Sequence, residues 1–165
     1  MPIAKHCASL FNYAGLDFPW DVAYGATVKD TMKAQCPENG NGHTEIHIGG
    51  DIAYLAYQRW MATHDVAWLK ETGYALISGV ARYYASRCSD DGKGGLIFKD
   101  ASGPDESGAS NSKRGGSVYI AALAKTLLAA ATALAPLAGD TSWPAQQMLA
   151  TAAKIVVTVN QSFPA

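Results

Sequence analysis

The chain has 165 residues, of which 48% are hydrophobic and 16% are charged, and its formal net charge is −1. This length suits a single domain with a sizeable core. A nearly neutral chain lacks the basic surface that attracts nucleic acid or an anionic membrane, so these partners are excluded and a near-neutral substrate is favoured.

The cysteines and the amino end carry few signals. Cys7, Cys36 and Cys88 are widely spaced and odd in number, which predicts free thiols rather than a disulfide framework or a metal site. Residues 1–6 do not begin a secretory signal. We also expect no apolar run that reaches the roughly 20 residues needed to span a bilayer. These observations leave the compartment open.

The first half of the chain predicts three helices. Apolar residues at three- and four-residue spacing indicate a helix over 3–14. A long loop over 15–43 follows, rich in Gly, Pro and Asn. Thr44 is the expected cap of a helix that reaches about residue 63. Asp65 is the expected cap of the next helix, 66–88, so these two helices form an antiparallel pair.

The second half predicts two more helices. Ser117 begins a helix rich in alanine and leucine that runs to about Ala135 and is followed by a break at Gly139. Because this helix is apolar on most sides, we expect it to be buried among the others. The last helix, 142–154, continues into a β-branched tail, 155–159, which is expected to fray or to form a strand.

The sequence therefore predicts an all-α chain of about five long helices in which long loops alternate with short ones. The loops 15–43 and 89–116 are expected at the same end of the helices, which would form the functional face. Four large aromatic residues are assigned to the core and two arginines to the helix surface or to ion pairs. These are Trp60, Trp68, Tyr83 and Tyr84, and Arg82 and Arg87, respectively.

The second long loop contains a candidate general acid. Gly103-Pro104 is a turn dipeptide that would hold Asp105 and Glu106 in a defined pose. A carboxylic acid in such a place suits proton transfer when burial or a neighbouring carboxylate keeps it protonated near the working pH. The alternative is a solvated acidic turn, which is the commoner use of such residues.

Five blocks of residues carry a family resemblance. They are Phe18-Pro19-Trp20-Asp21, Glu45 to Ala53, Ala62 to Asp65 with Trp68-Leu69, Ala81 to Arg87, and Gly103-Pro104-Asp105-Glu106. Their order, over about residues 8–135, resembles that of glycoside hydrolase family 65. That family includes acid trehalases, phosphorylases of maltose, trehalose or kojibiose, and a glucosidase acting on glucosyl-galactosyl-hydroxylysine of collagen.

The resemblance implies an (α/α)6 barrel domain that cleaves an α-glucosidic bond with inversion. It places the family's general acid at Glu106. The second group would be a carboxylate base in a hydrolase, roughly 6.5–9.5 Å from the acid, or inorganic phosphate as co-substrate in a phosphorylase. No other cofactor and no metal is implied.

Parts of the family pattern are absent from this sequence. A Trp-Asp block that grips the sugar, a Lys-Gln pair and the base or phosphate site do not appear. A barrel of six helical hairpins needs about twelve helices, so residues 1–165 are expected to form a single partial domain, incomplete at both ends. Ser107-Gly108 also replaces the usual Tyr-His after Glu106, and Asp21 replaces the usual Glu.

Besides Glu106, five residues are candidates for substrate binding. An aromatic ring beside a carboxylate suits a sugar, which favours Trp20 and Asp21, although the tryptophan could instead anchor the loop. Glu45 and His47 lie near a helix start and Asp105 lies beside the acid. The alternatives are a helix-dipole role for Glu45 and a structural role for His47.

The function predicted from these features is cleavage of an α-glucoside, either a disaccharide or a glucosyl conjugate, with Glu106 as acid. A disaccharide phosphorylase is the alternative within the same chemistry. A non-catalytic carbohydrate-binding protein or a vestigial helical remnant is the alternative outside it.

Overall fold

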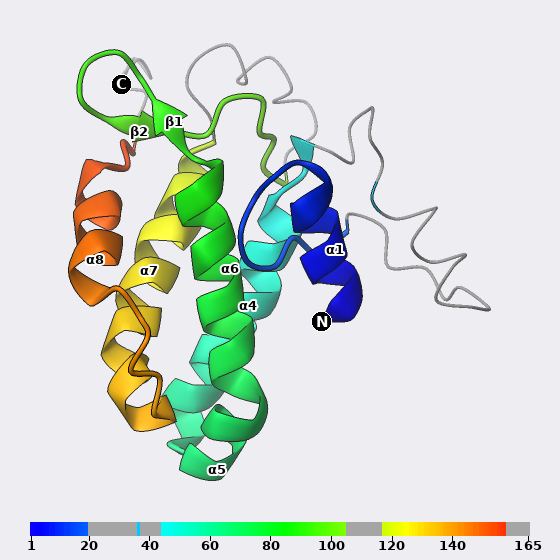
Figure 1. Cartoon of the computed structure of the whole chain (residues 1–165), viewed down its shortest axis with the longest axis vertical. Helices are drawn as coiled ribbons and strands as arrows, with labels where there is room; N and C mark the ends of the chain where they lie inside the picture. The colour runs from blue at the N-terminus through cyan, green and yellow to red at the C-terminus, as the bar shows by residue number, and fades with distance from the viewer. Residues whose placement is uncertain (20–35, 37–43, 105–116, 158–165) are drawn as a thin grey trace, which may run out of the picture.

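The computed structural model describes residues 1–19, 36, 44–104 and 117–157. The elements in chain order are α1 (Pro2–Leu10), α4 (His47–Thr63), α5 (Val66–Trp68), η1 (Leu69–Gly73), α6 (Tyr74–Arg87), β1 (Ser89–Asp90), β2 (Leu96–Ile97), α7 (Val118–Ala138) and α8 (Ala145–Lys154). The chain is all-α, as predicted, with one short antiparallel pair of strands (Figure 1).

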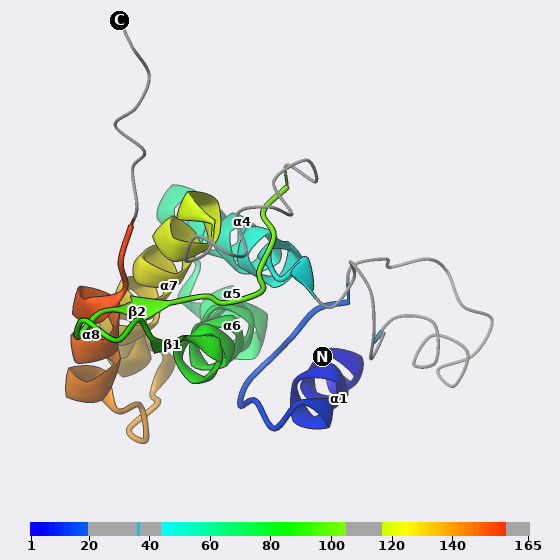
Figure 2. The ribbon, with the colours of Figure 1, turned by 90° about the horizontal axis from the view of Figure 1, so that it is seen from above.

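Helices α4, α6, α7 and α8 run up and down the long axis of the molecule (Figure 1), and α7 contacts the other three. The contact between α6 and α7 is the most extensive. Seen from above, α1 lies outside this group, beside α6 (Figure 2). The arrangement is that of a partial helical toroid, which confirms the predicted fold class.

Helix α7 is the central apolar helix. Five of its side chains, those of Ile120, Ala124, Leu127, Leu128 and Ala131, are completely buried. By length and composition alone, α7 is long and apolar enough to cross a membrane, whereas we expected no apolar run of that length. Slightly more than half of its most apolar stretch is buried against the neighbouring helices. The core helix of a folded domain has the same composition.

Of the two predicted helix caps, Asp65 is confirmed and Thr44 is not. The Asp65 carboxylate accepts a hydrogen bond from the backbone N–H of Trp68 at 3.0 Å, so this cap is confirmed. The predicted Thr44 cap is wrong, because α4 begins at His47 with Ile46 as its cap residue. The carbonyl of Thr44 instead accepts a hydrogen bond from the distant Ser102.

Two other predictions need correction. Cys7 and Cys36 form a disulfide, with their Cα atoms 5.3 Å apart, and Cys88 is the free cysteine. Their proximity is tertiary, so a spacing of 29 residues did not reveal it. The first helix ends at Leu10 rather than at residue 14 because Asn12 adopts a left-handed conformation with φ of 60°.

The β-branched tail pairs with the hairpin, as one of its two expected outcomes. Strands β1 and β2 are antiparallel, with Ser89 opposite Ile97. Ile155 forms a parallel bridge to Leu96, and the Val156 N–H donates to the Leu96 carbonyl at 2.9 Å. This pairing fastens the end of α8 beside the hairpin.

The core assignment of the aromatic residues is largely confirmed. Trp60, Tyr83 and Tyr84 are buried, while Trp68 is half-buried beneath the guanidinium of Arg59. The surface assignment of Arg87 is wrong, because its side chain is buried with only 7% of its surface exposed.

Candidate functional site

The described ends of the two long loops meet at one end of the bundle. The Ser102 N–H donates to the Thr44 carbonyl at 2.8 Å, and the Ser102 hydroxyl donates to the Thr44 hydroxyl at 3.3 Å. We call this end, formed by residues 44–51, 99–104 and 117–119, the loop end; it lies at the top of Figure 1. The predicted placement of both loops at the same end is confirmed for these segments.

Two candidate residues, Glu45 and His47, are buried at the loop end. Their exposed fractions are 4% and 6%, and the Nδ1 atom of His47 lies 3.4 Å from a carboxylate oxygen of Glu45. Within the described part of the chain, the buried Nδ1 atom makes no hydrogen bond of regular geometry. Since buried polar atoms normally lie against a polar partner, the Glu45 carboxylate is the group that faces this nitrogen among the described residues.

A tyrosine from α7 covers the imidazole of His47. The rings of His47 and Tyr119 meet edge to face with centroids 6.3 Å apart. The Tyr119 hydroxyl donates to the Asp51 carboxylate at 2.5 Å. This hydrogen bond, together with partial burial and the negative charge of Asp51, raises the pKa of Tyr119 to about 12. Tyr119 is therefore a fixed donor to Asp51, and the pair joins α7 to α4.

Close packing of α4 against α6 positions the buried pair. The Tyr84 hydroxyl donates to the Ile46 carbonyl, between Glu45 and His47, at 2.9 Å. Burial of its ring raises the pKa of Tyr84 far above its ordinary value. A Cβ atom on Gly50 would lie 2.3 Å from the Tyr84 hydroxyl oxygen, so this approach requires glycine.

The segment that leads to the candidate acid is fixed as far as Pro104. A Cβ atom on Gly103 would lie 2.6 Å from the Ser117 hydroxyl oxygen, so the chain passes the start of α7 in close contact. Phe18, at the beginning of another block, contacts the first turn of α4 near Gly49. The candidate residues Trp20, Asp21, Asp105 and Glu106 lie outside the described residues.

Several polar residues at or near this end were not predicted as functional from the sequence. Asp51, Ser102 and Tyr119 were not singled out, and Arg87 was assigned to the surface. Asp51 lies one helical turn after His47, a spacing that places both on one face of a helix and that could have signalled it. Ser102 and Tyr119 gave no comparable local signal, because their partners are far away in the sequence.

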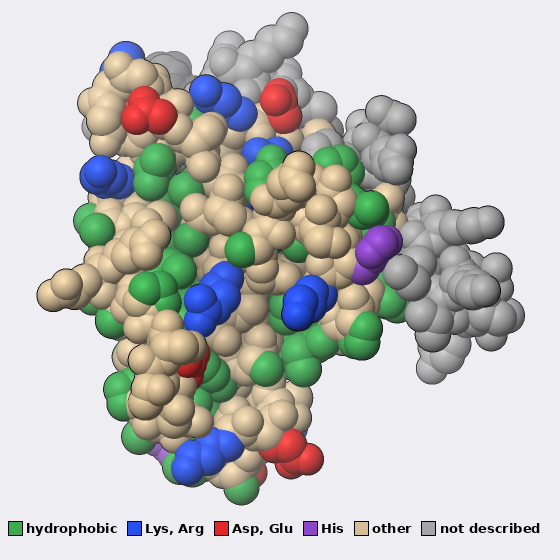
Figure 3. Space-filling view, in the orientation of Figure 1, with side chains coloured by type: hydrophobic (Ala, Val, Ile, Leu, Met, Phe, Trp, Pro, Cys, Tyr) green, Lys and Arg blue, Asp and Glu red, His purple; other side chains and the backbone are tan. Residues whose placement is uncertain are grey.

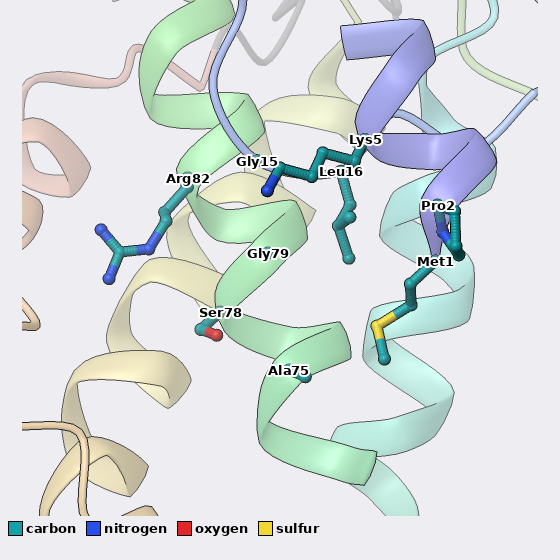
Figure 4. A pocket seen from close by; sticks show the side chains of 9 residues that line it. All are labelled: Met1, Pro2, Lys5, Gly15, Leu16, Ala75, Ser78, Gly79 and Arg82. Carbon is teal, nitrogen blue, oxygen red and sulfur yellow. The ribbon is translucent and has the colours of Figure 1, made fainter. Parts of the chain in front are cut away.

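A separate hollow lies on another face of the molecule. It is an open, mostly apolar groove of about 610 Å³ between α1 and α6, floored by small residues such as Gly79 and edged by Lys5 and Arg82 (Figure 4). The surrounding face carries few and scattered charged side chains (Figure 3). None of the groove residues belongs to the loop end, so the groove is not the candidate site.

The polar groups of the loop end include carboxylates, an imidazole and several hydroxyl groups. Among residues 1–19, 36, 44–104 and 117–157, no group of three or more His, Cys, Asp or Glu side chains is placed to hold a metal ion. A carboxylate, an imidazole and hydroxyl groups can exchange hydrogen bonds with several hydroxyls at once.

Comparison with known proteins gives a family match over almost the whole chain. The glycosyl hydrolase family 65 central catalytic domain matches residues 1–161.

Three relatives illustrate the range of activities. A kojibiose hydrolase of Flavobacterium johnsoniae is 34% identical over 62% of this chain and 14% of its own length. A kojibiose phosphorylase of Caldanaerobacter subterraneus is 32% identical over 52% of this chain and 12% of its own. The protein-glucosylgalactosylhydroxylysine glucosidase of Dictyostelium discoideum is 37% identical over 48% and 10%. The chain thus spans a small part of the length of the relatives it matches.

Proposed function

Because the chain belongs to glycosyl hydrolase family 65, we propose that it is the part of an α-glucoside-cleaving enzyme that supplies the general acid, Glu106. The substrate is a disaccharide or a glucosyl conjugate. Relatives named for kojibiose and for glucosylgalactosylhydroxylysine support this class of substrate.

One observation carries the proposal. The hydrogen bonds between Ser102 and Thr44 join the segment leading to Glu106 to the segment carrying Glu45 and His47. These are two of the blocks that carry the family resemblance, and they are more than 50 residues apart in the sequence. A sugar bound at the loop end would meet the buried pair on one side and the acid segment on the other.

The proposed chemistry is an inverting displacement at the anomeric carbon. Glu106 donates its proton to the glycosidic oxygen as the bond to the anomeric carbon breaks. Water, deprotonated by a carboxylate base, or inorganic phosphate forms the new bond on the opposite face. In our proposal Glu45, His47, Trp20, Asp21 and Asp105 hold the sugar. The base or the phosphate site would come from residues beyond those identified in this chain.

Hydrolysis and phosphorolysis are distinguished by their products. Relatives of both kinds match this chain. A hydrolase releases glucose from kojibiose without phosphate, whereas a phosphorylase requires phosphate and forms glucose 1-phosphate. We propose hydrolysis as the first reaction to test.

The decisive experiment uses the protein at the length at which it occurs in its source cells. We expect Glu106→Gln to lower turnover of kojibiose by at least about 100-fold, because a positioned acid contributes roughly 10²–10⁴-fold. Glu71→Gln is the matched control, since Glu71 is an exposed carboxylate at the opposite end of the bundle. Equal activity of Glu106→Gln and wild type would refute the acid role.

A carbohydrate-binding role without catalysis is the other outcome of the same experiment. It predicts that kojibiose slows amide exchange at residues 44–51 of the wild type while no glucose or glucose 1-phosphate appears. Neither binding nor turnover with any α-glucoside tested would refute the carbohydrate function altogether.

A further inference from the structure

The buried side chain of Arg87 joins the end of α6 to the segment that leads to Glu106. One terminal nitrogen, Nη2, donates to the carbonyls of Lys99 and Asp100, at 2.8 and 3.3 Å. Only 7% of the side chain's surface is exposed. Burying a guanidinium costs free energy unless the group is paired and hydrogen-bonded. The buried position of Arg87 therefore requires compensating contacts.

The surroundings of Arg87 compensate its burial in part, and its buried Nε atom makes no hydrogen bond with the described residues. Its guanidinium carbon lies 5.4 Å from the centre of the Tyr13 ring. Asp17 is close enough that the positive charge of Arg87 stabilises its carboxylate, and Asp17 also shares a hydrogen bond with Tyr83. The Asp17 N–H donates to the Ala4 carbonyl at 2.9 Å, which fixes this segment to α1.

The backbone at the Arg87 contact has an unusual conformation. Asp100 has a φ of 51°, in the left-handed region that residues other than glycine seldom adopt. The chain makes a turn at this residue, between the hairpin and Ser102. Two residues later, Ser102 makes its hydrogen bonds to Thr44. Arg87 therefore holds a turn in the segment that reaches Thr44, the neighbour of Glu45.

We propose that Arg87 is a positioning residue: it fixes the turn at Lys99 and Asp100 and thereby the course of residues 99–104, the segment that leads to Glu106. Among the residues that the structure describes, Arg87 contacts Lys99, Asp100 and Tyr13, so it acts on the backbone of this segment. The expected effect of Arg87 on catalysis rests on the proposed function. The turn at Lys99 and Asp100 does not, because it is described by the structure itself.

The experiment compares Arg87→Met and Arg87→Lys with Arg82→Met in the protein at its natural length. Methionine keeps much of the apolar stem and removes all donors, and lysine keeps the charge but not the planar fork. Arg82 lies on the same helix and faces Asp140 and Trp143, so it is a matched control. Amide exchange of residues 99–104 and the separate values of kcat and KM for kojibiose are measured.

We expect amide exchange at residues 99–104 to become at least tenfold faster in Arg87→Met, because the turn opens locally. We also expect kcat to fall about 10- to 100-fold, since small misplacements of a reacting group cost this much, while KM changes less than threefold. Arg87→Lys should recover part of both effects. Arg82→Met should change neither.

Unchanged exchange at residues 99–104 in both Arg87 variants would overturn the proposal. Faster exchange with unchanged kcat would also overturn the positioning role and leave the proposed function standing. Conversely, if the wild type cleaves no α-glucoside, the proposed function fails, and exchange alone decides whether Arg87 holds the turn. If Arg87→Met does not fold, the Arg87→Lys variant decides by the same readouts.

Discussion

The two ends of the helical bundle are held together in different ways. The end opposite the loop end, which we call the turn end, contains the connections 63–66 and 139–144. Its two connections are capped by local hydrogen bonds, since Asp65 accepts from Trp68 three residues away and Asp140 accepts from Ser142 two residues away. Asp140 also accepts from the distant Tyr74 hydroxyl at 3.0 Å. At the loop end the corresponding bonds join residues far apart, such as Ser102 with Thr44 and Tyr119 with Asp51.

The carboxyl groups near the two ends also differ in burial and in the direction of their pKa shifts. Asp140 at the turn end is partly exposed, and the hydrogen bond from Ser142 contributes most to lowering its pKa. Asp17, near the loop end, is largely buried, and burial raises its pKa to about 6 despite the hydrogen bond with Tyr83 and the charge of Arg87. The loop end thus holds the more deeply buried polar groups, such as Glu45 and His47, as functional sites often do.

The largest expected effect on stability comes from the glycine pair in the first turn of α4. A methyl group at Gly50 would collide with Tyr84 and Leu123, so we expect Gly50→Ala to cost about 3 kcal/mol through overpacking and the loss of the Tyr84 hydrogen bond. At Gly49 the same methyl group meets atoms no closer than 3.7 Å.

Gly49→Ala is therefore the control, and its higher helix propensity should leave stability equal or higher by up to about 1 kcal/mol. Urea unfolding followed by circular dichroism measures both variants. Equal midpoints for the two variants would show that the α4 and α6 helices do not meet as closely as described.

The next largest effect is the contribution of Asp17 to the pH dependence of stability. Its pKa in the folded state, about 6, lies above the ordinary value of 3.8. The folded protein thus binds this proton more tightly than the unfolded chain. The resulting stabilisation is complete below about pH 4 and is lost as the pH rises through 6, which amounts to about 2–3 kcal/mol.

We expect Asp17→Asn to remove this part of the pH dependence, so its stability relative to wild type should rise between pH 5 and pH 7.5. Asp140→Asn at the turn end should show no change relative to wild type between these pH values and a change only below about pH 4, because a lowered pKa gives stability that is lost as the pH falls below the ordinary value of 3.8. Urea titrations at several pH values test both. A constant difference between Asp17→Asn and wild type would contradict the burial of this carboxyl group.

The smallest pair of effects separates stability from function. Asp65→Ala should cost about 1 kcal/mol by removing a helix cap and should leave sugar binding and turnover unchanged. Ser102→Ala should cost about 0.5 kcal/mol, because its hydroxyl bond to Thr44 is long and partly buried. Even so, turnover should fall several-fold, since Ser102 joins the two segments of the site.

Thermal unfolding and kojibiose turnover are measured on the same preparations of both variants. Normal turnover in Ser102→Ala, with the expected small loss of stability, would mean that the backbone bond from Ser102 to Thr44 suffices. Lowered turnover in Asp65→Ala would contradict the expectation that changes at the turn end affect stability alone.

Most helices were predictable because their signals are local. The apolar periodicity of 66–88 and the side chain of Asp65 predict a helix that the structure places from Val66 through Arg87. The composition of 117–135 likewise predicts the buried α7, which extends three residues further and ends at a left-handed Gly139. Thr44 was misassigned because its carbonyl and hydroxyl are bound by Ser102, a partner 58 residues away.

For the candidate site, too, local properties were predictable from the sequence and long-range contacts were not. The sequence by itself determined the all-α class, the family and the candidates Glu45, His47 and Glu106, because residue type, order and helical spacing are local properties. Only the tertiary structure decided that Glu45 and His47 are buried together, that Cys7 pairs with Cys36, and that Arg87 is buried against Lys99 and Asp100. These contacts depend on how distant segments pack, and packing is decided by the whole core at once.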